Sequence, residues 1–172
     1  MNRCLKLVTV FVVLVGSTFA EQTTFQDSLL DRLIGRWILK GEIARKQTIH
    51  DVTSEWVLGH QYVRLHEVSR EKDSKGHPAY EASVFIGWDQ SSGEYACLWL
   101  DSTSSSGFST EGVGRARRIG EDIPFVFSDT NHQVTFRNTF SYDKQTDSWA
   151  WRMDNVRNGK DVPFGRVKLT KK

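Results

Sequence analysis

The chain has few cysteines and few prolines. Of its 172 residues, two are cysteine and three are proline. Cys4 falls in a leader-like segment, so Cys97 is the one cysteine expected in the mature protein, and no internal disulfide can form. The sequence contains no proline-rich linker, internal repeat or block of like charge. We therefore expect a single domain, residues 21–172, stabilised by a hydrophobic core.

Long hydrophobic runs are absent as well. The apolar run Leu7–Val15 is far shorter than the ~20 residues that cross a bilayer. Arg3 and Lys6 precede it, and small residues ending at Ala20 follow it, as in a cleavable signal peptide, residues 1–20. We expect an exported protein, periplasmic or secreted, with no membrane insertion after cleavage. The lack of a cysteine pair and of any Asn-x-Ser/Thr acceptor is compatible with a bacterial periplasm.

The mature chain has no excess charge of either sign. Loss of Arg3 and Lys6 from the 23 basic residues balances the 21 acidic ones. Proteins that bind nucleic acid by charge carry a clear basic excess, so a nucleic-acid partner is not expected. The cluster of Arg115, Arg117 and Arg118 is interpreted as a solvated strand face.

What the sequence does have is alternation of apolar and polar residues. Ala82, Val84, Ile86 and Trp88 alternate with other residues, and a turn at residues 89–93 separates them from a returning strand, residues 94–101. Similar segments predict nine or ten strands in all. They lie near residues 35–45, 48–58, 61–69, 107–118, 123–127, 134–142, 149–153 and 163–170.

A short amphipathic helix is expected over residues 28–34, with Gly35 as its stop. The fold class is thus all-β, and we predict an antiparallel up-and-down barrel with a short N-terminal helix that plugs one end. A barrel of this size has room for a ligand. A β-sandwich remains the alternative, because periodicity does not separate the two.

Two motifs carry a resemblance to a known group of proteins. The first is Gly35-Arg36-Trp37 with Arg166 in the last strand, which resembles the signature of the calycins (lipocalins, fatty-acid-binding proteins and relatives). In that group an arginine of the last strand packs on the tryptophan of the first. The second is Ile86-Gly87-Trp88-Asp89 with Leu98-Trp99-Leu100-Asp101-Ser102, which is similar to exported bacterial calycin-like proteins of unknown function.

The resemblance also implies kinship with nitrobindin-like haem-binding barrels. Those barrels hold haem through a histidine near the C-terminal strands, but the last histidine here is His132. His66 or Cys97 could substitute only in principle, and we expect no cofactor. We expect no metal site either. His60 and His66 would be roughly 20 Å apart on a continuous strand, while His50 and His77 have no obvious ligand partner nearby in the sequence.

The favoured function is non-catalytic binding of a small hydrophobic or amphipathic molecule inside the barrel. Candidate wall residues are Trp88, Trp99, Phe125, Phe136 and Trp151. Asp101 is a further candidate, although capping of the following turn is its simpler role. Arg64 and His66 would hold a polar head group if their strand face points inward, but Val63 and Leu65 on the opposite face look more like core.

Two alternatives remain open. An enzyme could act on such a ligand through His66, Asp101 or Ser102, although Asp101 and Ser102 are neighbours and should point to opposite faces. A partner-binding scaffold would instead have a fully packed barrel without a pocket above about 300 Å³.

Overall fold

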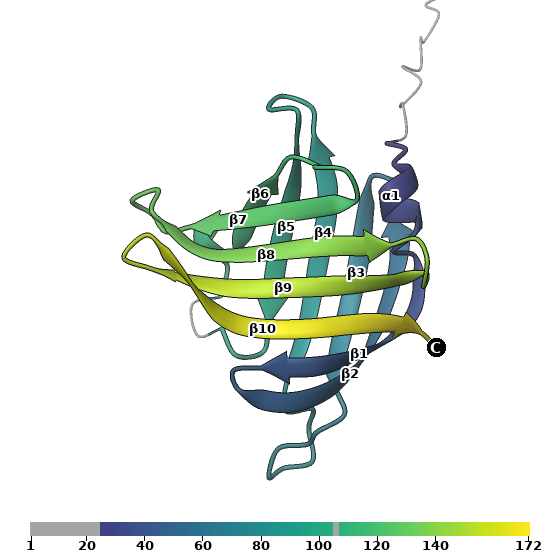
Figure 1. Ribbon diagram of the computed structural model, residues 1–172, viewed down its shortest axis with the longest axis vertical. Coiled ribbons are helices and arrows are strands. Elements are labelled where there is room, and N and C mark those ends of the chain that lie inside the picture. The colour runs from purple at the N-terminus through teal and green to yellow at the C-terminus, as the bar shows by residue number, and fades with distance from the viewer. Residues whose placement is uncertain (1–24, 105–106) are drawn as a thin grey trace, which may run out of the picture.

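The computed structural model describes residues 25–104 and 107–172, so the expected signal peptide, residues 1–20, lies outside the described residues. The described part of the chain forms a closed antiparallel barrel with one short α-helix (Figure 1). Within it, no helix is long and apolar enough to span a membrane. The elements are α1 (Ser28–Asp31), β1 (Gly35–Ile43), β2 (Lys46–Val57), β3 (Tyr62–Ser69), β4 (Glu81–Asp89), β5 (Glu94–Asp101), the 3₁₀ turn η1 (Thr110–Gly112), β6 (Val113–Ala116), β7 (Asp122–Ser128), β8 (Val134–Asp143), β9 (Ser148–Arg157) and β10 (Lys160–Lys171).

The ring closes between the first and last strands. Each strand pairs with its neighbour in sequence, and β10 returns to β1 with Trp37 opposite Lys171 and Ile43 opposite Gly165. Strands β8 to β10 cross β3 to β5 at a steep angle (Figure 1). Closure leaves no unpaired sheet edge. The predicted all-β barrel is therefore confirmed and the sandwich alternative is wrong.

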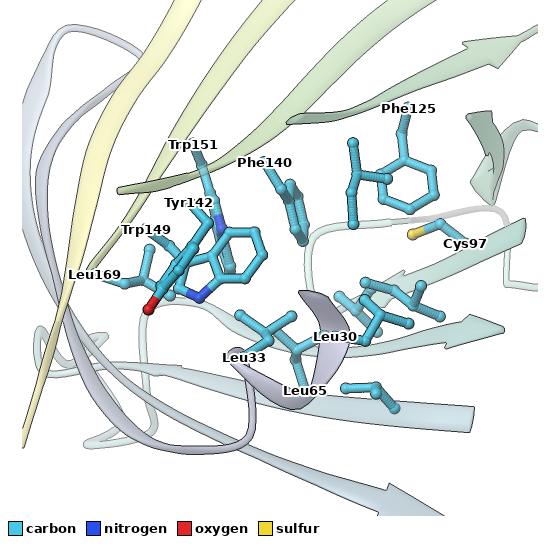
Figure 2. Close-up of a cluster of buried hydrophobic side chains, with 14 of the residues drawn as sticks. Leu30, Leu33, Leu65, Cys97, Phe125, Phe140, Tyr142, Trp149, Trp151 and Leu169 are labelled. Atoms are coloured by element: carbon cyan, nitrogen blue, oxygen red, sulfur yellow. The ribbon is translucent and has the colours of Figure 1, made fainter. Parts of the chain in front are cut away.

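The alternation noted in the sequence sorts side chains between the barrel interior and the solvent. In β4, Ala82, Val84 and Ile86 are buried, and in β9 Trp149 and Trp151 are buried, because alternate residues of a strand share one face. Figure 2 shows the core rings together with Leu30 of α1 and Leu33, which follows the helix. One predicted strand differs, because residues 107–118 contain η1 and only a short β6.

Helix α1 closes one end of the barrel. Its leucines Leu29 and Leu30 are buried, and the Asp27 carboxylate accepts hydrogen bonds from their backbone N–H groups at 2.8 and 2.9 Å. Trp37 Nε1 donates to the Leu33 carbonyl at 2.7 Å, and Trp149 Nε1 donates to the Arg32 carbonyl at 3.3 Å. The observed helix ends at Asp31, whereas residues 28–34 were predicted to be helical, because the segment after Asp31 turns toward β1. A cavity opens at the opposite end of the barrel.

The expected contact between Arg166 and Trp37 is absent. Lys171 lies over the Trp37 ring, with Nζ 5.5 Å from its centroid, because the register places Lys171 opposite Trp37 and Arg166 opposite Glu42. Arg166 instead donates to the Met153 carbonyl at 2.6 Å and pairs with the buried Asp154. The prediction that Arg166 packs on Trp37 was therefore wrong, although another cation of the last strand, Lys171, does cover the tryptophan.

Candidate ligand cavity

A cavity of about 580 Å³ opens at the barrel end opposite α1. It lies among the end of β1, the start of β2, the ends of β3, β5 and β7, and the loops between them. Its lining consists of Ile43, Lys46, Thr48, His50, Glu67, Ser69, Glu71, Ala79, Tyr80, Trp99, Asp101, Thr103, Ser104, Gly107, Ser109, Glu111, Gly112, Phe127, Thr135, Phe136, Trp151, Met153 and Phe164. The volume is in the range of small-molecule sites, about 300–1,000 Å³.

One wall of the cavity is apolar and largely aromatic. The Phe136 ring packs edge-on against Phe127 and Phe164, each at 5.9 Å between centroids. Deeper in the barrel, Trp151 stacks on the core residue Phe140 at 4.5 Å and meets Trp99 edge-on at 6.3 Å. These ring contacts make the wall a continuous aromatic surface.

The facing wall is polar and is built on β2 and β3. Thr48 and His50 are two residues apart on β2 and so share the inward face, where Glu67 of β3 joins them. The Thr48 hydroxyl lies 2.6 Å from His50 Nε2, while His50 Nδ1 bonds to the Glu67 carboxylate. His50 is 4% exposed and Glu67 is 2% exposed. A carboxylate on Nδ1 favours the tautomer in which Nδ1 carries the proton and Nε2 accepts from Thr48.

Tyr80 connects this pair to the rest of the polar wall. Its ring stacks on the His50 ring at 5.6 Å, and its hydroxyl accepts a hydrogen bond from Trp99 Nε1 at 3.1 Å. Burial, and next the charge of Glu67, raise the pKa of the Tyr80 hydroxyl well above its usual range, and Asp101 adds to the rise. The hydroxyl therefore stays protonated and lies within electrostatic reach of both carboxylates.

Negative groups outnumber positive ones around the cavity. The described lining has four acidic residues, Glu67, Glu71, Asp101 and Glu111, against the single lysine Lys46 and no arginine. Lys46 Nζ lies 2.5 Å from a Glu71 carboxylate oxygen, so its charge is already matched. The remaining charge of the described lining is negative.

Two polar side chains on or beside the apolar wall lack partners. Trp151 Nε1 and both side-chain polar atoms of Asn138 are buried without a hydrogen bond. The two residues are 2% and 1% exposed, on the neighbouring strands β9 and β8. Buried polar groups are rarely left unpaired, so each calls for an explanation.

Four of the predicted site residues line the cavity, namely Trp99, Asp101, Phe136 and Trp151. Asp101 also caps the turn after β5, as its simpler interpretation predicted. Its Oδ1 accepts from the Thr103 backbone N–H at 2.8 Å and from the Thr103 hydroxyl at 2.6 Å. The cavity is thus lined both by three of the predicted aromatic residues and by Asp101, whose carboxylate is fixed by hydrogen bonds within the turn.

Arg64 and His66 do not reach the cavity, which corrects their placement among the candidates. Both project outward from β3, where Arg64 pairs with Glu55 and His66 lies 2.7 Å from Glu81. The reason is the alternation of β3, which turns Val63, Leu65 and Glu67 inward. The outward orientation that Val63 and Leu65 favoured is confirmed.

Trp88 and Phe125 are also outside the cavity. Trp88 lies at the closed end of the barrel, 42% exposed, and stacks on Phe25 at 6.0 Å. It shares a strand face with Ile86 but lies beyond the last buried layer. Phe125 does point inward, yet it is packed in the core against Phe140 at 5.6 Å and does not contact the open space.

The residues considered for catalysis do not converge. His66 is on the outer surface, and the Ser102 hydroxyl accepts the Glu81 backbone N–H at 3.0 Å. Among residues 25–104 and 107–172, no group of three or more His, Cys, Asp or Glu side chains could share a metal ion. Cys97, one of the two substitutes considered for haem, is buried in the core, and burial raises the pKa of its thiol.

Sequence reasoning missed the polar wall. His50 was judged to lack a nearby partner, but the pairing of β2 with β3 brings Glu67 to it from seventeen residues away. A signal was present in β3, because Glu67 continues the apolar face of Val63 and Leu65. Asn138 likewise interrupts the inward aromatic series of β8.

All three residues of the arginine cluster are exposed, but only Arg115 lies in a strand, because β6 ends at Ala116 and Arg117 and Arg118 follow it. Arg115 pairs with Asp89, and Arg117 lies 3.0 Å from Glu94.

No model of a known protein family matches the chain, and no curated protein matches its sequence.

Proposed function

We propose that the chain is an exported binding protein that holds one small amphipathic molecule in the open end of its barrel. The observation that carries the proposal is the 580 Å³ cavity, in which an aromatic wall faces the polar wall of His50, Glu67 and Tyr80. An apolar pocket with a few convergent polar groups is the usual form of a small-molecule site. A packed scaffold has no need of such a space, and the calycin resemblance points in the same direction.

The burial of His50 and Glu67 adds support. Placing two ionisable groups away from water lowers stability unless each is well partnered, and an apolar pair of similar size would often serve stability as well or better. Their position on a cavity wall suggests that they are kept for contact with a ligand. The unpaired Trp151 Nε1 nearby supports the same interpretation.

Nile red, a neutral dye that fluoresces in apolar surroundings, tests the proposal. We expect a saturable signal with one dye per chain. Ala79→Trp at the cavity entrance should weaken binding about tenfold, roughly 1.4 kcal/mol. The matched control is Ala150→Trp on the exposed outer face of β9. No dye binding by the unmodified protein, or equal binding by the two variants, would contradict the proposal. Native mass spectrometry of the protein from its own compartment then identifies any retained ligand.

Hydrolysis of a bound ester is a second candidate function, favoured by one specific geometry. Thr48, His50 and Glu67 form a hydroxyl–imidazole–carboxylate relay, the order in which a base activates a nucleophile. His50 would accept the Thr48 proton as the hydroxyl attacks an ester carbonyl, and would then protonate the departing alcohol, leaving the acyl group on Thr48. Water, losing a proton to His50, would next attack this acyl group, and His50 would return the proton to the Thr48 oxygen as the carboxylic acid leaves. Release of nitrophenol from nitrophenyl esters should be lost in Thr48→Val and retained in Thr48→Ser. Equal rates in all three proteins would eliminate this function.

A further inference from the structure

We infer that the ligand carries a positively charged, hydrogen-bond-donating head group, an amine or a guanidine, rather than a carboxylate. This inference rests on the proposed binding function and names its substrate class. Arg64 and His66, the candidates considered for holding a polar head group, do not bear on this choice, because neither side chain reaches the cavity.

The charges of the described lining carry the first step. A carboxylate ligand needs a cation to receive it, and buried charges are stable only when they are paired. Lys46 is the single lysine or arginine among the described lining residues, and Glu71 is already bound to it. Glu67, Asp101 and Glu111 would repel an anion and attract a cation.

The place for the head group is the polar cluster around Tyr80. Tyr80 stacks on His50, which bonds to Glu67. The Tyr80 hydroxyl also accepts a hydrogen bond from Trp99, which shares the inward face of β5 with Asp101, so a chain of contacts links the two carboxylates along this wall. The hydrogen bonds to Asp101 in the turn come from uncharged backbone and hydroxyl groups, which leave its net charge in place. An ammonium group seated here would meet two acids and the oxygen of Tyr80.

The aromatic residues favour a cation as well. Trp99 reaches from this cluster, where it bonds to Tyr80, to Trp151 on the apolar wall. Indole faces attract cations, and a head group that leaves water for this site gains more from them than one in solution. The apolar remainder of the ligand would then lie against Phe136 and Phe164.

Trp151 provides an independent observation on the same ligand. Its side chain is 2% exposed, lines the cavity and has an Nε1–H without a partner. A donor in this position is matched by an acceptor on the ligand, such as a hydroxyl, ether or carbonyl oxygen. A cationic amphipath with such an oxygen satisfies both the acidic cluster and the indole.

A matched probe series tests the inference by isothermal titration calorimetry on the purified protein at neutral pH. Naphthylethylamine, naphthylethanol and naphthylacetate share one flat apolar group and differ mainly in the charge of the head group. We expect the amine to bind at least about tenfold more tightly than the alcohol, and the acetate to bind more weakly than either. Added salt should reduce the preference for the amine, since salt screens charge.

Variants locate the source of the preference. Glu67→Gln and Asp101→Asn should each bring the amine-to-alcohol ratio toward one, whereas Glu55→Gln, on the outer face of β2, should leave it unchanged. Because both probes are measured on the same variant, a general loss of structure would lower both affinities and leave the ratio high.

The outcomes separate this inference from the proposed function. Tighter binding of the alcohol or the acetate, or a preference that survives both cavity variants, overturns the cationic head group and leaves ligand binding intact. If no member of the series binds and Nile red does not bind either, the proposed function fails and the inference fails with it. If Nile red binds and the amine does not, only the inference is lost.

Discussion

The losses of stability caused by replacing His50 and Glu67, which form a buried pair, should not add in the double variant. Because both side chains are less than 5% exposed, removing one partner takes from the other a hydrogen bond that little water can replace. His50→Leu strands the Glu67 carboxylate, and we expect it to cost about 3–5 kcal/mol of unfolding free energy. Glu67→Leu leaves a neutral imidazole that keeps its contact with Thr48, and should cost about 1–3 kcal/mol.

The double replacement by leucine removes both buried polar groups. It should therefore be more stable than His50→Leu alone, by about 2 kcal/mol, because the second substitution eliminates the stranded charge. The measurement is urea unfolding followed by tryptophan fluorescence and far-UV circular dichroism. Equal denaturant slopes would show that the unfolding transitions are comparable.

The outer face of the neighbouring strands offers a matched control. His66 and Glu81 lie 2.7 Å apart, but their side chains are 40% and 50% exposed. Leucine at either position should change stability by no more than about 0.5–1 kcal/mol, since water replaces the lost partner. If the inner double variant loses the sum of the two single losses, or if inner and outer pairs behave alike, the reasoning about burial is refuted.

Three further predictions concern the barrel itself. The Cys97 thiol, whose pKa is raised by complete burial, should resist Ellman's reagent in the native protein and react on unfolding, as mapped by peptide mass spectrometry. Gly41→Ala should lower the free energy of unfolding by more than about 3 kcal/mol, because the φ of Gly41 is +152° and an added Cβ would lie 2.2 Å from a backbone oxygen of β10. Gly76 lies in open space with a φ of +84°, so Gly76→Ala should lower it by only about 1 kcal/mol. Thermal unfolding measures both variants. Arg166→Ala should destabilise by about 2–3 kcal/mol, because the buried Asp154 carboxylate then keeps only its longer contact with the exposed Arg152, at 3.6 Å. Lys171→Ala should lose no more than about 1 kcal/mol, and the reverse order would show that the cation over Trp37 is the more important contact.

The architecture could be predicted from local sequence because its cause is local. Val84 and Ile86 alternate with polar residues over a strand length, and such a pattern buries one face of a sheet wherever the strand is placed. Several strands of this kind on a chain without disulfides leave closure into a barrel as a stable solution. The aromatic side of the cavity followed from the same pattern, which explains why Trp99, Phe136 and Trp151 were found.

Strand pairing accounts for the contacts that local sequence did not predict. His50 and Glu67 become partners only through the register of β2 with β3, and Lys171 rather than Arg166 covers Trp37 through the register of β1 with β10. A shift of one residue would turn each of these side chains to the other face. The local alternation of apolar and polar residues is enough to predict the all-β fold. Which polar groups meet inside the barrel depends on contacts between strands, and these follow from register and barrel closure, which no local pattern contains.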